Sequence, residues 1–206
     1  MSNNMLGNLP LSEVQGPRDD FEQKLAGPEG TVWLSAFKRF LRKENTWSKE
    51  PQTSTIVVDC DARPRIPSSL KLEGKGTEHR QLGKITLKKR DGKLYANGVE
   101  VIRFLSPNQK DGKIIRGDKL RKELQKMQVL NACILDALLA HPELIPDEWK
   151  NGATYFWATI FSDADGDLCV EYLYWSGGSW RRSNYWLEGD WLGSGPAAVL
   201  ASTIGV

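Results

Sequence analysis

The chain of 206 residues is 40% hydrophobic, which is enough to bury a core as one domain or two small ones. Three widely spaced cysteines (Cys60, Cys133 and Cys169) argue against a disulfide framework or a zinc site and predict reduced, buried thiols. No apolar run approaches the ~18 to 20 residues of a membrane span and the first residues do not resemble a signal peptide, so we expect a cytoplasmic protein without a membrane partner.

A net charge of +2 hides an uneven distribution along the chain. Residues 63–126 hold 18 Lys and Arg against 7 Asp and Glu, whereas residues 127–206 hold 3 against 10. The basic segment predicts either a phosphate-attracting surface or a face that docks on the acidic tail and protects strand edges, and we favour the second. A nucleic-acid interface would use Lys88, Lys89, Arg90, Arg116, Lys119, Arg121 and Lys122.

The expected fold class is α+β. Helices are expected in residues 1–50, a basic β-meander with a following helix in residues 54–126, and a helix with an aromatic antiparallel sheet in residues 127–206, which can form one domain with the meander. Apolar residues at helical spacing after Pro28 predict a short amphipathic helix; they are Trp33, Phe37, Phe40 and Leu41. Residues 46–53 are expected to be a linker, and the β-branched residues 55–58 a strand.

From Gly83 onward the hydrophobic pattern changes to a period of two. Segments 85–90, 93–95 and 99–105 are separated by Asp91-Gly92 and Asn97-Gly98, which adopt the positive φ angles of tight hairpin turns. This pattern predicts a three-stranded antiparallel meander.

Two helices are expected next. Asp118 can cap a helix that runs to about Lys126. A second helix, residues 131–140, should end before His141-Pro142 and rest on a sheet through the stripe formed by Ile134, Leu135, Leu138 and Leu139.

The last third of the chain is rich in Tyr and Trp, and its spacing predicts an antiparallel three-stranded sheet. A two-residue turn at Gly177-Gly178 pairs Trp175 with Trp180, Tyr174 with Arg181 and Tyr172 with Ser183. A second turn at Asp165-Gly166 pairs Trp157 with Tyr174 and Thr159 with Tyr172. A longer loop at 163–167 would shift that register by one residue and reverse the faces of residues 155–161.

These registers divide the aromatic residues between two faces. The face without hydroxyl groups is expected to be the core beneath the 131–140 helix: Phe156, Ala158, Ile160, Cys169, Leu173, Trp175, Trp180 and Trp186. The other face, which also holds Phe161, offers the residue types that dominate recognition surfaces. The predicted binding residues there are Tyr155, Trp157, Tyr172, Tyr174, Arg181 and Tyr185.

Evidence for catalysis or metal binding is weak. The segment from Asp163 to Asp167 resembles the start of a calcium loop, but glycine stands fourth and the twelfth position is Tyr174, so a solvated turn is the better interpretation. His79 and His141 lack partners at metal-ligand spacing. No nucleophile elbow, phosphate loop or dinucleotide motif is present, and we expect neither a metal nor a cofactor.

Three stretches carry a family resemblance: 33–47, 129–150, and 155–161 through 196–202. The sequences and the order of these stretches resemble those of a family of uncharacterised proteins from candidate-phylum bacteria. The resemblance includes Trp33-Leu-Ser-Ala-Phe-Lys-Arg-Phe-Leu and Val129-Leu-Asn-Ala-Cys-Ile-Leu-Asp-Ala. The resemblance covers about half the chain. It implies a bacterial cytosolic protein and brings no activity, cofactor or site residues with it.

The leading functional hypothesis is a non-enzymatic binding module whose aromatic face holds a protein or a small ligand. Nucleic-acid binding through the basic segment is the alternative. An enzyme with an unrecognised acid and base is the third, and it would require two acids, or His79 with an acid, to converge in a deep pocket.

Overall fold

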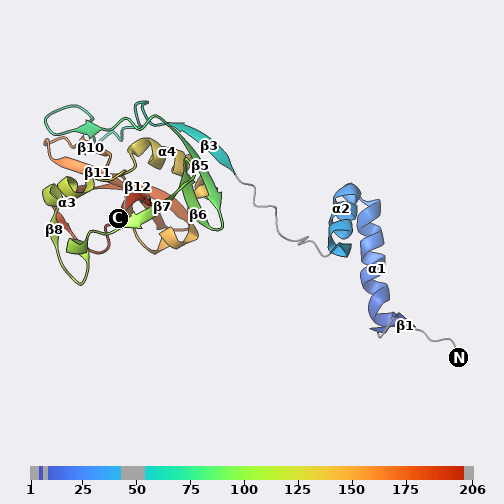
Figure 1. Cartoon of the computed structure of the whole chain (residues 1–206). Helices are drawn as coiled ribbons and strands as arrows, with labels where there is room; N and C mark the ends of the chain where they lie inside the picture. The colour runs from blue at the N-terminus through green and yellow to red at the C-terminus, as the bar shows by residue number, and fades with distance from the viewer. Residues whose placement is uncertain (1–4, 7–8, 43–53, 202–206) are drawn as a thin grey trace. The chain divides into compact units, whose positions relative to one another are not determined.

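The computed structural model describes residues 5–6, 9–42 and 54–201 (Figure 1). The chain divides into two compact units, Met1–Gln52 and Thr53–Val206, which we describe separately. The expected linker, residues 46–53, lies outside the described residues. Both helices and strands build the chain, so its fold class is α+β. The basic segment and the aromatic segment belong to the same unit.

The amino-terminal unit consists of a small hairpin followed by two helices. In order they are β1 (Met5–Leu6), β2 (Leu9–Pro10), α1 (Leu11–Ala26) and α2 (Gly30–Leu41), and β1 pairs with β2 in antiparallel fashion. The amphipathic helix predicted after Pro28 is α2.

The two helices approach closely where α2 begins. Gly30 is buried, and a Cβ atom on it would lie 2.0 Å from the carbonyl oxygen of Leu25. Further along, the rings of Phe21 and Phe37 lie 4.6 Å apart. Glycine is therefore required at position 30 for α1 and α2 to pack together.

A ten-stranded sheet spans the described part of the second unit. Its strand order is β3-β5-β6-β7-β14-β9-β11-β10-β4, and β12 pairs with β11. The strands are β3 (Thr55–Asp59), β4 (Glu78–His79), β5 (Lys84–Arg90), β6 (Lys93–Ala96), β7 (Val99–Phe104), β9 (Thr154–Tyr155), β10 (Thr159–Ser162), β11 (Leu168–Ser176), β12 (Ser179–Trp186) and β14 (Ala197–Leu200).

The remaining elements surround this sheet. Strands β8 (Ile115–Arg116) and β13 (Asp190–Trp191) pair with each other. The helices are α3 (Gly117–Leu124) and α4 (Ala132–Ala140), with the short 3-10 helices η1 (Pro107–Gln109), η2 (Pro142–Leu144) and η3 (Asp147–Asn151). The predicted pair of helices is confirmed, with α3 ending two residues before Lys126. The predicted cap is wrong, because Arg116 precedes the helix and Asp118 lies within its first turn.

The predicted meander is confirmed as β5, β6 and β7. Both turns have positive φ at each central residue: 52° and 76° at Asp91 and Gly92, and 51° and 81° at Asn97 and Gly98. These angles give the strands the tight hairpins that their dipeptides predicted.

The second predicted sheet is not separate from the meander. Strand β14 pairs antiparallel with β7 and parallel with β9, so the aromatic strands extend the same sheet. The hairpin register across Gly177-Gly178 is confirmed: Trp175 pairs with Trp180, Tyr174 with Arg181 and Tyr172 with Ser183.

The register predicted across Asp165-Gly166 is wrong. Tyr172 pairs with Tyr155, and Phe161 pairs with Cys169, because a turn at residues 157–158 divides the expected strand into β9 and β10. The loop itself is longer than two residues: the Asp163 Oδ1 atom accepts hydrogen bonds from the backbone amides of Asp165 and Asp167.

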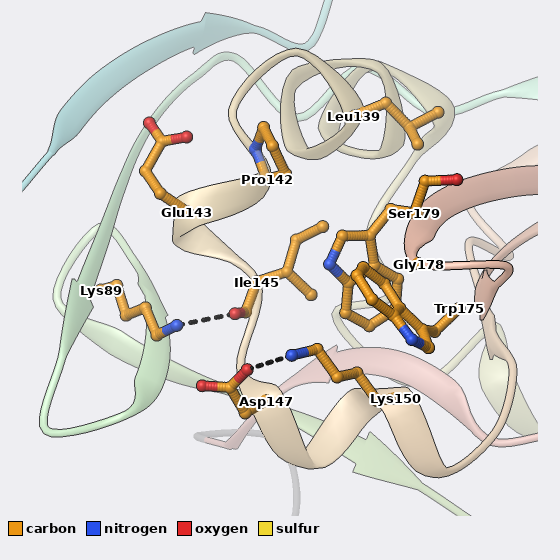
Figure 2. A pocket seen from close by; sticks show the side chains of 11 residues that line it. Lys89, Leu139, Pro142, Glu143, Ile145, Asp147, Lys150, Trp175, Gly178 and Ser179 are labelled. Atoms are coloured by element: carbon orange, nitrogen blue, oxygen red, sulfur yellow. Dashed lines mark hydrogen bonds and ion pairs between the residues drawn. The ribbon is translucent and has the colours of Figure 1, made fainter.

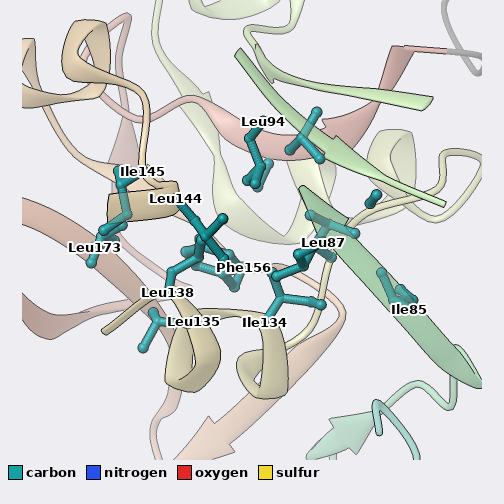
Figure 3. Packing of buried hydrophobic residues seen from close by; sticks show 14 of the residues in the cluster. Ile85, Leu87, Leu94, Ile134, Leu135, Leu138, Leu144, Ile145, Phe156 and Leu173 are labelled. Atoms are coloured by element: carbon teal, nitrogen blue, oxygen red, sulfur yellow. The ribbon is translucent and has the colours of Figure 1, made fainter. Parts of the chain in front are cut away.

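The core beneath α4 joins both halves of the unit. Figure 3 shows Ile134, Leu135 and Leu138 of α4 packed against the meander and against the aromatic strands. Their partners include Leu87, Leu94, Phe156 and Leu173. The apolar stripe of α4 therefore rests on the sheet as predicted. Because its partners come from both sequence segments, the meander and the aromatic strands share one core.

Candidate functional site

Two of the six residues predicted to bind a partner are inside the protein. Tyr155 is 8% exposed and Trp157 is 1% exposed. Both rings pack against Trp191, with centroid distances of 4.7 Å and 4.5 Å. The prediction that Tyr155 and Trp157 present their rings to a partner is therefore wrong.

The cover over these rings comes from distant parts of the chain. Pairing of β8 with β13 brings Trp191 beside Ile115, and α3 contributes Leu120 to the same buried cluster. The fit is close at Gly117, where a Cβ atom would lie 1.9 Å from the carbonyl oxygen of Leu187. A second core thus occupies the face that the sequence pattern left open.

The other four predicted residues lie at the surface. Tyr172, Tyr174 and Tyr185 are half-buried, and Arg181 is exposed. The ring of Tyr172 lies between those of Tyr155 and Tyr174, at 4.7 Å and 5.5 Å. Tyr172 and Tyr185 pack against the second core, so the predicted face is not a fully exposed aromatic surface.

A groove of about 510 Å³ lies instead at the tip of the β11–β12 hairpin (Figure 2). One wall is formed by Trp175 and Trp180, which flank the Gly177-Gly178 turn. Their rings meet edge to face, 5.3 Å apart and at 68°. The opposite wall comes from η2, η3 and the end of α4, and its lining residues are Leu139, Pro142, Glu143, Ile145, Asp147 and Lys150.

Charged side chains hold the groove together. The Lys150 ammonium donates to Asp147 Oδ1 at 2.6 Å and lies 4.8 Å from the Trp175 ring centroid. From the meander, the Lys89 ammonium donates to the Ile145 carbonyl oxygen at 2.8 Å (Figure 2). The hydrogen bond and the charge of Lys150 lower the pKa of Asp147. The groove therefore combines two large rings with a rim that carries both signs of charge.

The sequence analysis placed Trp175, Trp180 and Trp186 in the core. The structure leaves Trp175 and Trp180 half-buried and Trp186 52% exposed, where its indole Nε1 donates to Asp163 Oδ2 at 3.0 Å. The core beneath α4 includes Leu173, and Trp180 packs against this core while staying half-buried. No sequence signal pointed to Ile145 or Lys150, which reach the groove only through tertiary packing.

The seven basic residues proposed for nucleic-acid binding lie in two separate groups. Lys88, Lys89 and Arg90 belong to β5, whereas the other four belong to β8 and α3 at the opposite side of the unit (Figure 1). Several contact other groups of the same chain: Arg121 binds Glu78 at 2.6 Å, and Arg116 lies 3.9 Å from Asp190.

The hypothesis of an enzyme required an acidic residue close to His79, but the side chains that contact His79 are those of Thr159 and Cys133. Its Nδ1 atom lies 2.8 Å from Thr159 Oγ1, and its Nε2 atom lies 3.9 Å from Cys133 Sγ. Burial raises the pKa of Cys133 to about 11, so the thiol is protonated at neutral pH and is a poor nucleophile. All three cysteines are buried and unpaired, as predicted.

Glu171 is the most deeply buried carboxyl group of the described residues. It is 1% exposed, and burial raises its pKa to about 7 although Arg182 lies 3.4 Å away. Arg182 also binds Asp136. This cluster joins β11, β12 and α4 within the core, away from the lining of the groove, so we assign it to folding.

A scan of protein-family models finds none that matches this chain, and searches of curated proteins and of solved structures find no match either. The resemblance to a family from candidate-phylum bacteria stays a prediction. Among helices in the described ranges, none combines the length and the apolar composition needed to traverse a lipid bilayer.

Proposed function

We propose that the protein is a non-enzymatic binding module that holds a short segment of a partner protein in the groove at the β11–β12 tip. The observation that carries this proposal is the pair formed by Trp175 and Trp180, two adjacent half-buried indoles that line a groove of about 510 Å³. The site replaces the Tyr155 and Trp157 face, which the second core covers.

The rings are suited to anchor a partner. Trp is enriched among the residues that dominate binding energy, since it offers a large area with few rotatable bonds. The cross-strand contact at 5.3 Å and the Lys150 ammonium 4.8 Å from Trp175 restrain both indoles before binding. Restrained side chains lose less entropy on association, so the same contacts give a higher affinity.

The rim favours a peptide over a polyanion. Lys89 and Lys150 face the groove together with Glu143 and Asp147, so charges of both signs are balanced there. A peptide offers carbonyl acceptors and amide donors that suit such a rim, and proline-rich segments are known to dock in grooves lined by aromatic rings. A groove whose charges are balanced offers a phosphate no net electrostatic attraction.

The proposal can be tested by NMR with a panel of short peptides that contain proline or aromatic residues. Each of the eight Trp residues gives one indole N–H signal. A binding peptide should shift the Trp175 and Trp180 signals and leave that of exposed Trp186 unchanged. If no peptide shifts the two groove signals, or if soluble oligosaccharides do so and peptides do not, the proposed ligand class is wrong.

We rank nucleic-acid binding second. A groove lined by Lys113, Arg116 and Lys119 lies beside α3, yet Glu123 lines it as well and β5 contributes nothing to it. The basic residues therefore offer two small patches and no continuous track for a phosphate backbone.

A further inference from the structure

Helix α2 concentrates apolar side chains at the surface. Of the nine large apolar residues that are exposed in the described part of the chain, five belong to this twelve-residue helix. They are Val32 at 64%, Leu34 at 41%, Phe37 at 38%, Phe40 at 61% and Leu41 at 64% exposure. Such a concentration marks an interaction surface, because scattered single residues are the norm elsewhere.

Four of these side chains lie on one side of the helix. Leu34, Phe37 and Leu41 are spaced by three and four residues, and Phe40 lies one turn from Phe37. Helix α1 covers this side only in part: Phe21 contacts Phe37, but Phe37 is still 38% exposed. The two helices therefore share one seam and leave the rest of the stripe open.

A pair of helices this short cannot bury a sufficient core by itself. Units below about 40 residues usually need a disulfide, a metal or association with another chain. Residues 1–52 contain neither Cys nor His, so they offer no disulfide and none of the Cys and His ligands of structural zinc sites. Of these three ways to stabilise a short unit, association with another chain is the one that the composition favours.

The charges indicate which partner fits. Helix α1 contains four acidic and two basic residues, whereas α2 contains two basic residues and no acidic one. A two-fold axis that places α1 of one copy against α2 of the other therefore brings opposite charges together on both sides. An anionic membrane would instead meet the exposed carboxylates of α1, of which Glu22 and Asp20 are paired with Arg18 and Lys24.

We propose that α1 and α2 of two copies pack into a four-helix bundle, which makes the protein a homodimer through its amino-terminal unit. The stripe of Leu34, Phe37, Phe40 and Leu41 forms the shared core. This proposal is independent of the groove at the β11–β12 tip.

The test is the mass of the full chain in solution, measured by light scattering during gel filtration. The wild type should have twice the 23.2 kDa chain mass, and the variant Phe40→Glu/Leu41→Glu should have the single mass. Two controls should stay dimeric: Phe40→Met/Leu41→Met, which keeps the stripe apolar, and Ile114→Glu, which changes a 57% exposed residue of the second unit.

Four outcomes overturn the proposal. The first is a monomeric wild type, and the second is a dimer that survives the Glu substitutions. The third is a monomer that sediments with vesicles of phosphatidylserine and phosphatidylcholine, which would assign the stripe to a membrane surface. The fourth is loss of the dimer in the Met control, because a core built on apolar contact should tolerate a change that keeps the stripe apolar.

Discussion

Trp175 and Trp180 face each other across the Gly177-Gly178 turn, with their rings 5.3 Å apart. The contact fixes both side chains at the end of the β11–β12 hairpin, where Trp180 also packs against the core beneath α4. Cross-strand aromatic pairs contribute roughly 0.5 to 1.5 kcal/mol beyond the area they bury, so this pair also stabilises the hairpin. The same geometry that holds the strands together forms one wall of the groove.

The burial of Trp157 predicts that its role is structural. Trp157→Ala should lower the free energy of unfolding by about 3 to 5 kcal/mol, because the change leaves a large cavity beside Trp191. Arg181→Ala, which changes an exposed side chain, should cost less than about 0.5 kcal/mol. Urea denaturation of both variants measures this difference. If both variants lost the same small amount of unfolding free energy, the structural role of Trp157 would be contradicted.

Glu171 should make stability depend on pH. Because its folded pKa of about 7 lies above the ordinary value of 4.5, its stabilising contribution is complete below pH 4.5 and is lost as the pH rises through about 7. The loss is at most about 3 kcal/mol, from a shift of about 1.4 kcal/mol per pKa unit.

Glu171→Gln should flatten this part of the profile, since the amide does not ionise. The measurement is the unfolding free energy in urea at a series of pH values from below 4.5 to above 7. Glu188→Gln, a change at an exposed carboxyl group after β12, is the matched control and should keep the wild-type slope. Parallel profiles for wild type and Glu171→Gln would rule out this role for Glu171.

Separation of the basic residues predicts weak binding to nucleic acid. At physiological salt, the wild type should not raise the fluorescence anisotropy of labelled random oligonucleotides, whether single-stranded or duplex. Lys88→Gln and Lys119→Gln, one from each group, should have no further effect. Tight, salt-sensitive binding that both substitutions weaken would show that the two groups act together.

Local turn chemistry explains which parts of the fold could be predicted. Asp91-Gly92, Asn97-Gly98 and Gly177-Gly178 each set a tight hairpin that the structure confirms, and at Gly177-Gly178 the predicted register is confirmed too. The pattern failed at residues 155–161, where side-chain hydrogen bonds from Asp163 enlarge the loop and a turn interrupts the strand. A change of one residue there reverses every side chain.

The candidate site was less predictable, because it depends on which surfaces distant elements cover. Hydroxyl-bearing rings suggested a free face, yet β8, α3 and β13 cover Tyr155 and Trp157. The hydroxyl-free rings of Trp175 and Trp180 suggested core. Trp180 does pack against the core beneath α4, yet both rings stay half-buried and line the groove together with Leu139 of α4. The sequence indicated that this sheet has more aromatic rings than one buried face can hold. Which of these rings are exposed to solvent depends on tertiary packing.

The most direct test of the groove is the affinity of a fluorescently labelled peptide, chosen from the NMR panel, for three variants. Trp175→Ala and Trp180→Ala should each weaken binding by about thirtyfold, or about 2 kcal/mol, as expected for aromatic anchors. Trp186→Ala, on the same hairpin but outside the groove, should bind within about twofold of the wild type. Wild-type affinity in both groove variants, with their folds intact by circular dichroism, would contradict the assignment of this groove as the binding site.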